Sequence, residues 1–446
     1  MVFDYVIVGG GSAGSVLARR LTDDPSVSVC LIEAGGEGRD RLIRTPAGVV
    51  AMLPGRPKIN NWAYETVPQP GLGGRRGYQP RGKALGGSSA INAMLYVRGH
   101  PSDYDGWAAA GCPGWSWDEV LPWFRKAEAN QRGADDLHGA DGPLQVSDQP
   151  SPRPVSRAFI EAAAECQFPV NEDFNGPRQE GVGLYQVTQF HSGPAKGERC
   201  SAAAAYLHPV MAARPNLHVM TRTHATRILI EDGRATGIAW RRGRETGEVR
   251  ARAEVILSGG AFNSPQLLML SGIGPAAELS ALGIPVVADR PGVGRNLQDH
   301  PDFILGWSST DSDMFGIGMA GTGRLFRAWR EWQRNRTGML TTPFAEGGAF
   351  LKTDPALDRP DIQLHFVISI VDDHARKLHA GYGFSCHVCV LRPKSRGSVR
   401  LASADPLAAP AIDPAFFADP DDLAVMLKGT RITRRILSAP ALAPYR

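Results

Sequence analysis

Apolar and polar residues follow one another at the N-terminus in the pattern of a strand, a helix and a second strand. Residues 6–8 (VIV) form a short apolar run that predicts a buried strand, and residues 16–21 continue at helical spacing. A second apolar run, VSVCLIE, ends at Glu33. This order predicts a β-α-β unit whose second strand ends on an acidic residue.

Two later regions show further regular patterns. The apolar run at residues 254–257 leads through paired glycines into FNSPQLLML, where Asn263 or Ser264 is expected to cap a helix that Gly272 ends. We expect this run to be a later strand of the same sheet. The segments IQLHFVISI and FSCHVCVL alternate as strands do and predict an antiparallel sheet.

A further helix is predicted near residue 446. Asp419 suits the N-cap position, Pro420 the first helical position, and acidic residues fill the first turn. This helix requires a packing partner, because one of its faces is expected to carry five apolar residues: Leu423, Met426, Leu427, Ile432 and Ile436.

Two long segments lack such periodicity. Residues 34–82 are rich in proline and glycine, and a long irregular segment inside a compact domain is usually functional. Residues 311–338 are glycine-rich at first, then basic and helical (LFRAWREWQRNR). This second segment could cover a pocket as a lid or contact another subunit, and a solvated helix is the alternative.

Composition and charge narrow the class of protein. A chain of 446 residues, 43% hydrophobic and 21% charged, is expected to form two soluble globular domains. The 49 basic and 45 acidic residues leave a net charge of +4 without a long basic run, which argues against nucleic acid as a partner. No apolar stretch has the length of a membrane span and no leader precedes the first strand. We therefore expect a cytoplasmic location, with peripheral attachment at the inner membrane as the alternative.

The six cysteines are scattered, and only Cys386 and Cys389 are close in sequence. On the predicted strand these two would face opposite sides of the sheet, and no second CxxC completes a zinc site. We expect reduced structural thiols and no metal site.

The glycines after the first strand have the spacing of a dinucleotide-binding turn. Gly9, Gly11 and Gly14 would supply a tight turn, a close backbone approach to pyrophosphate, and packing of the helix on the strand. The phosphate charge would lie at the helix N-terminus, with Ser12 among the candidate contacts. Glu33, nineteen residues after Gly14, is placed to accept a hydrogen bond from a ribose hydroxyl. A glycine-rich turn in an unrelated α/β domain is the alternative.

The segments that follow favour FAD over a nicotinamide cofactor. A nicotinamide-binding domain usually continues with strands and helices, whereas the irregular residues 34–82 could bury a bulky flavin. Residues 82–92 (GKALGGSSAIN) combine small residues, which let the backbone approach a flat or charged ligand, with serine hydroxyls that can reach phosphate. Taken alone, this stretch would be a turn as often as a ligand loop.

Together these segments resemble a known family. GKALGGSSAIN, with Gly99 and Asp105 downstream, and GAFNSPQLLMLSGIG are similar to the two signature motifs of the glucose–methanol–choline (GMC) flavoprotein oxidoreductases. The N-terminal GGGSAG and the segment GVGRNLQDHP fit the same family in order and spacing. The stretch VDDHARKLHAGYGFSCHVCVLRPKSRG resembles the choline- and aliphatic-alcohol-dehydrogenase-like subgroup.

The resemblance implies a fold of the α/β class. A Rossmann-like FAD-binding domain is expected at residues 1–160 and 205–305. A substrate domain, with an antiparallel sheet flanked by helices, is expected at residues 161–204 and 306–446.

The resemblance also implies an activity. Family members pass a hydride from the carbinol carbon of an alcohol to flavin N5. The implied function is FAD-dependent oxidation of a primary alcohol, choline-like or aliphatic, to the aldehyde. The electrons would go to a quinone, another acceptor or oxygen, and a homo-oligomer is compatible with the family.

Cofactor contacts are carried over by the same resemblance. Gly9, Gly11, Gly14 and Glu33 would hold the ADP half of FAD. The contacts implied for the pyrophosphate, isoalloxazine and adenine are Ala84, Gly87, Ser88, Asn92 and Ala225.

Two further positions bear on attachment and substrate. Some members attach FAD covalently through a histidine where this chain has Ile91, so we expect non-covalent FAD. Glu346 matches a glutamate that lines the pocket of choline-oxidising relatives, and a surface or interdomain carboxylate is the alternative.

The catalytic residues of the family are not found in this sequence. The family's base is a histidine, partnered by a second histidine or an asparagine, in a segment with His-Pro-x-Gly-Thr and Gly-Asn-Thr-Asn motifs. None of the 11 histidines matches it, and those of the predicted substrate sheet would by default be satisfied core or surface residues: His365, His374, His379 and His387. His100 and His300 lie in flavin-domain motifs.

We therefore expect the pair beyond Arg446, a C-terminal truncation, and little or no turnover by this chain alone. A non-catalytic FAD-binding remnant and a redox-silent cyanohydrin lyase of the same family are the alternatives.

Overall fold

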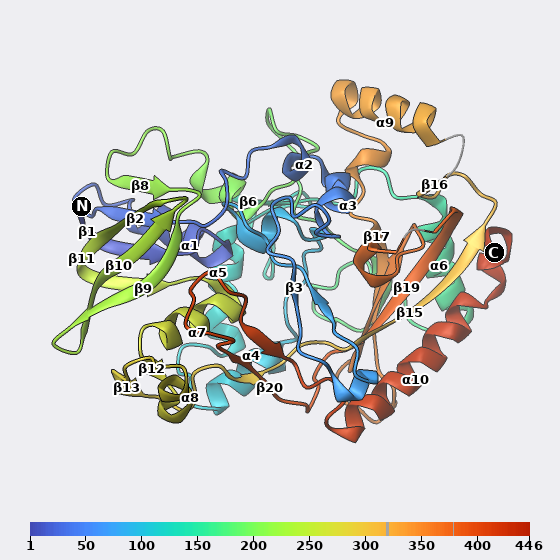
Figure 1. The fold of residues 1–446 in the computed structure, drawn as a ribbon. Helices are drawn as coiled ribbons and strands as arrows, with labels where there is room; N and C mark the ends of the chain where they lie inside the picture. Colours follow the sequence, from blue (N-terminus) through green and yellow to red (C-terminus); the bar gives the residue numbers. More distant parts are fainter. Residues whose placement is uncertain (318–320, 378) are drawn as a thin grey trace.

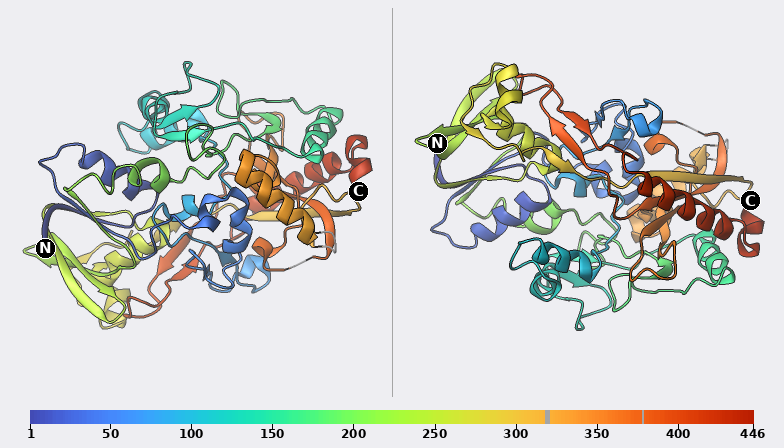
Figure 2. Two further views of the ribbon diagram at one scale, coloured as in Figure 1. Left: turned by 90° about the horizontal axis from the view of Figure 1, so that it is seen from above. Right: turned by 90° about the horizontal axis from the view of Figure 1, so that it is seen from below.

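Two large β-sheets lie at opposite ends of the molecule (Figures 1 and 2). The computed structural model describes residues 1–317, 321–377 and 379–446. The predicted segment 311–338 includes residues 318–320, which lie outside the described residues.

The first sheet contains the predicted β-α-β unit. Strand β1 (Val2–Val8) is longer than expected, and α1 (Ser12–Leu21) follows the glycine turn. Strand β1 pairs in parallel with both β2 (Val29–Ile32) and β11 (Glu245–Leu257). The prediction that residues 254–257 belong to a later strand of this sheet is confirmed, because they end β11. The strand order is β8 (Leu217–Met220), β2 (Val29–Ile32), β1 (Val2–Val8), β11 (Glu245–Leu257), β10 (Arg234–Arg242) and β9 (His224–Glu231).

The helix after β11 begins earlier than its sequence suggests. Helix α7 spans Gly260–Leu270 with Gly259 at its N-cap, so the predicted cap at Asn263 or Ser264 is wrong. The side-chain amide of Asn263 instead donates to the hydroxyl of Tyr64 (2.8 Å). The paired glycines allow the first turn of α7 to begin shortly after β11 ends, because Gly260 adopts a positive φ of +79.

The second sheet confirms the predicted antiparallel pair. IQLHFV and FSCHVCV form β18 and β19, with His365 opposite His387 in the register. Helices α6 (Pro154–Glu165) and α10 (Pro420–Leu437) pack on one face, where Phe159 stacks on Phe366 at 4.5 Å between ring centroids. The strand order is β15 (Asp302–Ser309), β19 (Gly381–Val390), β18 (Ile362–Val367), β17 (Ala345–Leu351) and β7 (Gly181–Leu184), and β16 (Gly316–Ile317) also pairs with β19.

Helix α10 has the predicted start but a different buried face. The carboxylate of Asp419 accepts from the amide of Asp421, as an N-cap does. Leu423 and Leu427 are 45% and 49% exposed, so their predicted burial is wrong. At about 100° per residue the five predicted positions spread over two faces, and the buried face is centred near Thr433.

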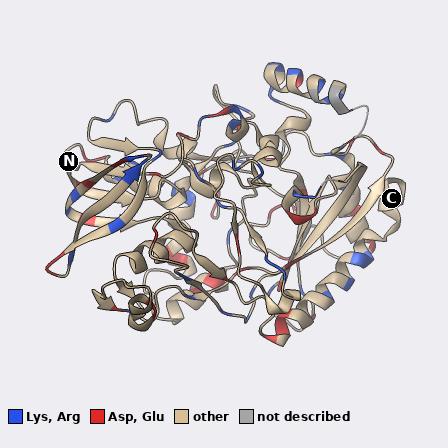
Figure 3. Ribbon diagram, in the orientation of Figure 1, with Lys and Arg blue, Asp and Glu red and all other residues tan. Residues whose placement is uncertain are grey.

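Shorter elements connect the two sheets. The irregular residues 34–82 contain α2 (Arg41–Arg44), α3 (Val49–Met52), β3 (Tyr64–Glu65) and β4 (Tyr78–Gln79). Helix α9 (Gly321–Asn335) stands at the edge of the molecule and carries several arginines (Figures 1 and 3). The other elements are α4 (Pro101–Ala109), α5 (Trp117–Ala127), β5 (Glu128–Asn130), β6 (Leu144–Val146), β12 (Ile273–Gly274), α8 (Ala276–Ala281), β13 (Ala288–Asp289), β14 (Arg295–Leu297), β20 (Gly397–Arg400) and β21 (Ala411–Asp413).

The predicted domain boundaries stay predictions. Strand β7, from predicted substrate-domain residues, joins the second sheet, and β8 to β11 join the first. Strand β15 begins at Asp302, a few residues before the predicted boundary at 305/306.

Candidate functional site

A cavity of about 520 Å³ opens at the carboxyl ends of β1, β2 and β11. This is where ligands bind in doubly wound sheets, because loops and helix N-termini meet there. Seven of the predicted cofactor residues line it: Gly9, Gly11, Ser12, Glu33, Gly87, Ser88 and Ala225. Gly14, Ala84 and Asn92 do not line it.

Gly14 does not face the cavity; it packs against the backbone of the glycine turn. A Cβ atom at Gly14 would lie 1.9 Å from the carbonyl oxygen of Gly9, and one at Gly9 would lie 2.4 Å from that of Ser258. Gly9 also has φ +98, a conformation that residues with side chains rarely adopt. The turn therefore brings three segments of backbone together at the start of α1.

Two glycine segments that are distant in sequence meet at the cavity. A Cβ atom on Gly87 would lie 2.7 Å from Cα of Gly11, and Gly87 has φ +53. The amide of Gly86 donates to the carbonyl of Gly10 (2.7 Å). The hydroxyl of Ser88 accepts from the amide of Gly82 (3.2 Å). The result is a backbone cradle of the kind that admits a pyrophosphate, so the residues present fit a dinucleotide such as FAD.

Glu33 lies at the cavity wall and is held in place by backbone. Its carboxylate accepts from the amides of Gly10 (2.8 Å) and Gly35 (2.7 Å). Burial raises the pKa of Glu33 to about 7, against the lowering effect of these two hydrogen bonds and of Lys83. The carboxylate retains acceptor capacity for a ribose hydroxyl.

Ala84, Ile91 and Asn92 belong to the 82–92 loop and fasten it to neighbouring segments. Ala84 pairs with Gly36, and Ile91 is buried in an apolar cluster with Ile43. Isoleucine offers no atom that can bond covalently to a flavin, in agreement with non-covalent FAD. The side-chain and main-chain oxygens of Asn92 accept from the buried guanidinium of Arg199.

Several cavity residues did not emerge from the sequence patterns. Trp62, His224, Phe262 and Pro406 line the same cavity as Ala225. His224 adjoins Ala225 in HATRILI, so that motif could have identified it. Trp62 and Pro406 come from irregular segments and carry no such signal.

A polar cluster lies on the face of the second sheet that is turned away from α6 and α10. Nδ1 of His387 lies 2.6 Å from Oδ2 of Asp302, and His365 is opposite His387 in the register. Burial alone would raise the pKa of Asp302, but the charge and hydrogen bond of His387 outweigh it and lower this pKa. Burial, followed by the charge of His387, lowers the pKa of His365 to about 4, so His365 is neutral at pH 7.

From the sequence, each of these histidines is predicted separately to be a core or surface residue. The structure brings His365, His374 and His387 into one electrostatic environment around Asp302. The predicted pairing of IQLHFV with FSCHVC could have indicated that two histidines lie side by side on neighbouring strands.

Glu346 is buried and holds the start of α6. Its carboxylate accepts from the amide of Arg153 (2.6 Å) and from the hydroxyls of Ser156 (2.8 Å) and Thr342 (2.8 Å). The residue has no exposed surface, and burial raises its pKa. Contact between Glu346 and a substrate stays a prediction.

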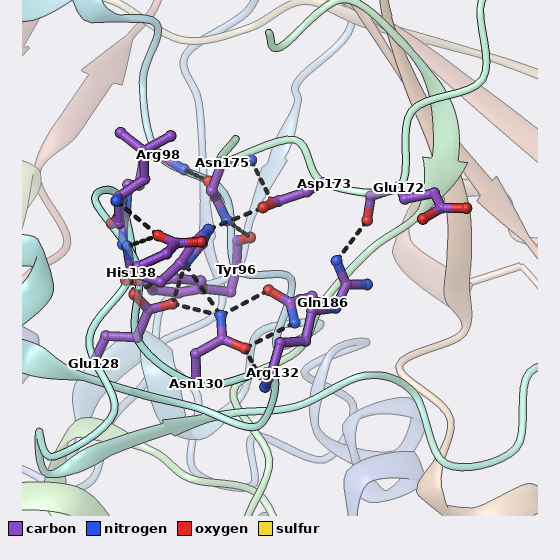
Figure 4. A network of polar contacts seen from close by, with 12 residues as sticks. Tyr96, Arg98, Glu128, Asn130, Arg132, His138, Glu172, Asp173, Asn175 and Gln186 are labelled. Carbon is purple, nitrogen blue, oxygen red and sulfur yellow. Dashed lines mark hydrogen bonds and ion pairs between the residues drawn. The ribbon is translucent and has the colours of Figure 1, made fainter. Parts of the chain in front are cut away.

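A second polar network, which is mostly buried, does not line the cavity (Figure 4). Arg98 pairs with Glu128 (2.7 Å), and His138 contacts both Glu128 (3.1 Å) and Asp173 (2.9 Å). Because each charge has a partner, we assign this network to the stability of the loops that it joins.

The described residues show neither a metal centre nor a membrane span. No group of three or more His, Cys, Asp or Glu side chains among them is arranged to hold a metal ion. None of the described helices combines the length and apolar character needed to cross a bilayer.

Comparisons with known proteins agree with these features. Models of the GMC oxidoreductase family match residues 3–302 and 393–445. An "alcohol dehydrogenase [acceptor]" of Pseudomonas putida is 46% identical over 447 residues, which cover 100% of this chain and 80% of the relative. An "oxygen-dependent choline dehydrogenase" of Sinorhizobium medicae is 42% identical over 453 residues, with 100% and 79% covered. Among solved structures, pyridoxine 4-oxidase from "Mesorbium loti" matches with a TM-score of 0.86 and 33% identity, covering 100% of this chain and 82% of that one.

Proposed function

Because the chain belongs to the GMC oxidoreductase family, we propose that it serves the oxidation of a primary alcohol, choline-like or aliphatic, to the aldehyde, as the family does at full length. It is an FAD-dependent oxidoreductase that acts on alcohols and passes the electrons to an acceptor. The observation that carries this function is the contact between Gly11 and Gly87, which joins the two glycine segments into one cradle.

Bound FAD supplies the acceptor for the hydride of the carbinol carbon. The residues of this chain would hold and orient it, with the turn at Gly9–Gly14 at the pyrophosphate, Glu33 at a ribose and Ala225 at the adenine. The 82–92 loop would lie between this site and the face of the second sheet that carries Asp302, His365 and His387. That polar face would then border the space for the alcohol.

We keep the prediction that the catalytic histidine and its partner are not among these 446 residues. The motif that would contain them is not found in the sequence, and the match leaves about a fifth of the Pseudomonas relative outside the aligned region. The residues of this chain would then bind and orient alcohol and FAD, and general-base catalysis, worth about 10²–10⁴-fold, would be lacking.

Anaerobic reduction of FAD tests both statements. The FAD-loaded 446-residue chain is mixed with ethanol, a long-chain primary alcohol or choline, and loss of the flavin absorbance is followed. Slow bleaching that dithionite completes is the expected result. Rapid bleaching would place the base inside the chain, with His387 and His365 as first candidates. Cyanohydrin cleavage without any bleaching by alcohols would instead support a lyase.

For the acceptor and the location we propose a quinone and peripheral attachment to the cytoplasmic face of an anionic membrane. Helix α9 is anchored by Trp332, whose indole N–H donates to the carbonyl of Gly197 (3.0 Å). Phe326 and Trp329 are 57% and 45% exposed and stack at 6.1 Å. Exposed arginines, including Arg327 and Arg330, share the helix. Exposed aromatic and basic side chains on one helix suit the interface of anionic lipids.

Flotation with lipid vesicles tests this attachment. The protein should float with vesicles that contain phosphatidylglycerol and remain below with phosphatidylcholine alone. A Phe326→Ser/Trp329→Ser variant should lose flotation, whereas the control Trp123→Ser, an exposed tryptophan on α5, should keep it. If the α9 variant changes the mass in solution and not flotation, α9 is a contact between subunits.

A further inference from the structure

A buried arginine, Arg199, donates hydrogen bonds to the 82–92 loop. Arg199 is only 2% exposed, and its Nη1 donates to the main-chain oxygen (2.7 Å) and Oδ1 (2.8 Å) of Asn92 and to the carbonyl of Ser89 (3.3 Å). Its Nε donates to the carbonyl of Ile43 (3.1 Å). Its Nη2 has no hydrogen-bond partner among the described residues.

The charge of Arg199 is not balanced by a carboxylate of the described chain. The neighbouring Glu198 turns away and pairs with Arg44 (2.6 Å) and Arg336 (3.1 Å). Burial lowers the pKa of Arg199 to about 9, so the guanidinium remains protonated at neutral pH. A buried cation bonded only to neutral oxygens costs free energy unless an anion approaches it.

We propose that Arg199 stabilises the negative charge that the flavin ring acquires on two-electron reduction, and this rests on the proposed function. Transfer of a hydride adds two electrons and one proton to the neutral oxidised ring, so the reduced ring carries one negative charge. The reduced ring would then supply an anion for the cation that Ser89 and Asn92 hold. An electrostatic interaction in a site of low dielectric acts over several ångströms without direct contact.

The contacts of Arg199 favour the flavin ring over the pyrophosphate as the balancing anion. Gly11 and Gly87 form the cradle for the pyrophosphate. The free N–H groups at the N-terminus of α1 supply positive charge to that anion. Arg199 bonds to the other end of the loop, three of its four hydrogen bonds going to Ser89 and Asn92. In this scheme Arg199 bonds to the loop and does not touch the ring, so it acts on the ring through its charge and is not a catalytic residue.

A purely structural clamp is the competing explanation, and sulfite binding separates the two. Sulfite forms a bond from its sulfur to flavin N5, and the displaced electron pair leaves a negative charge on the ring, without any alcohol. In the FAD-loaded protein, Arg199→Met should raise the Kd for sulfite about tenfold, and lower the two-electron midpoint potential by about 30 mV for each tenfold change. Arg199→Lys keeps the charge with fewer hydrogen bonds and should stay within about threefold of the parent chain.

Two further variants keep the test decisive. Asn92→Asp places a carboxylate where Arg199 already donates, so it should weaken sulfite binding while the arginine and its hydrogen bond remain. Arg214→Met removes one charge at the far end of α1, where Arg214 pairs with Asp23 (2.6 Å), and should leave the Kd for sulfite unchanged.

The proposal fails if Arg199→Met binds FAD more weakly but keeps the parent Kd for sulfite and the parent potential, because the arginine then acts on both redox states equally. It also fails if Arg199→Lys and Arg199→Met lose sulfite binding alike. Neither the Kd for sulfite nor the midpoint potential is measured with an alcohol. Both can therefore be interpreted even if the chain does not oxidise alcohols.

Discussion

Asp302 and His387 form a close polar pair, with 2.6 Å between Oδ2 and Nδ1, on the neighbouring strands β15 and β19. Both side chains lie on the sheet face turned away from α6 and α10, and His365 stands across from His387 on β18. The carboxylate fixes the orientation of the imidazole through Nδ1 and leaves Nε2 free of any hydrogen bond among the described residues. A sheet face with this pair can offer a polar group to an alcohol oxygen.

We expect His387→Ala to weaken alcohol binding about tenfold, the effect of losing one hydrogen bond to a charged or polar group. Asp302→Asn should have a smaller effect, because the imidazole remains but is less strongly oriented. The Kd of a primary alcohol, read from perturbation of the flavin absorbance under anaerobic conditions, provides the measurement. His218→Ala, in β8 of the other sheet, is the control, and an equal loss in this control would show that the effect is not local.

A methyl group at Gly87 should abolish FAD binding. The added Cβ would lie 2.7 Å from Cα of Gly11, and neither backbone can yield without opening the cradle. Gly243→Ala is a matched control, since Gly243 has a similar φ of +60 but open space around it. We expect Gly87→Ala to raise the Kd of FAD by at least about a hundredfold, whereas Gly243→Ala should cost only about 1 kcal/mol of stability. Fluorescence titration with FAD measures the first and thermal unfolding the second.

The elements around the dinucleotide site were predictable because their signals are local. A GxGxxG turn between two apolar runs specifies strand, turn and helix within about thirty residues, and the parallel pairing of β1 with β2 follows from it. The acid at the end of the second strand reaches the same cavity for the same reason.

Features that depend on the packing of distant segments could not be predicted in this way. Arg199 is 107 positions from Asn92, and nothing in KGERCSAAAAYL marks it as the support of the 82–92 loop. The polar face around Asp302 requires the register of two strands that are 85 residues apart. The buried face of α10 combines Gly429 and Thr433 with the large apolar residues Met426, Ile436 and Leu437, and leaves Leu423 and Leu427 exposed.

Acid precipitation should release the cofactor. The family resemblance implies that Ile91 occupies the position where some members attach FAD covalently, and an aliphatic side chain cannot form such a bond. After precipitation with trichloroacetic acid the yellow colour should remain in the supernatant. A yellow pellet would require another attachment residue.

Glu346→Gln should affect stability more than substrate affinity. An amide accepts only through its oxygen, so the NH2 group must face either the hydroxyl of Thr342 or the two donors at Arg153 and Ser156. At least one hydrogen bond must therefore reverse or be lost, at a cost of up to about 1–3 kcal/mol. We expect a lower melting temperature and, for choline and an aliphatic alcohol, Kd values within about twofold of the parent chain. A large loss of choline affinity with unchanged melting would instead establish the substrate contact implied by the family resemblance.

The buried network around His138 should make stability fall at high pH. Asp173 and Glu128 raise the pKa of His138 from 6.5 to about 9, through hydrogen bonds that outweigh burial. A group whose folded-state pKa is raised stabilises the fold fully below its unfolded-state pKa, and this contribution is lost as the pH rises through the folded-state value. The contribution is at most roughly 3 kcal/mol below pH 6.5 and declines between pH 6.5 and 9. Urea unfolding across this range should show the decline in the parent chain. His138→Gln should be less stable at pH 6.5 and should show a flatter profile up to pH 9, and a parallel decline in both proteins would assign the pH dependence to other groups.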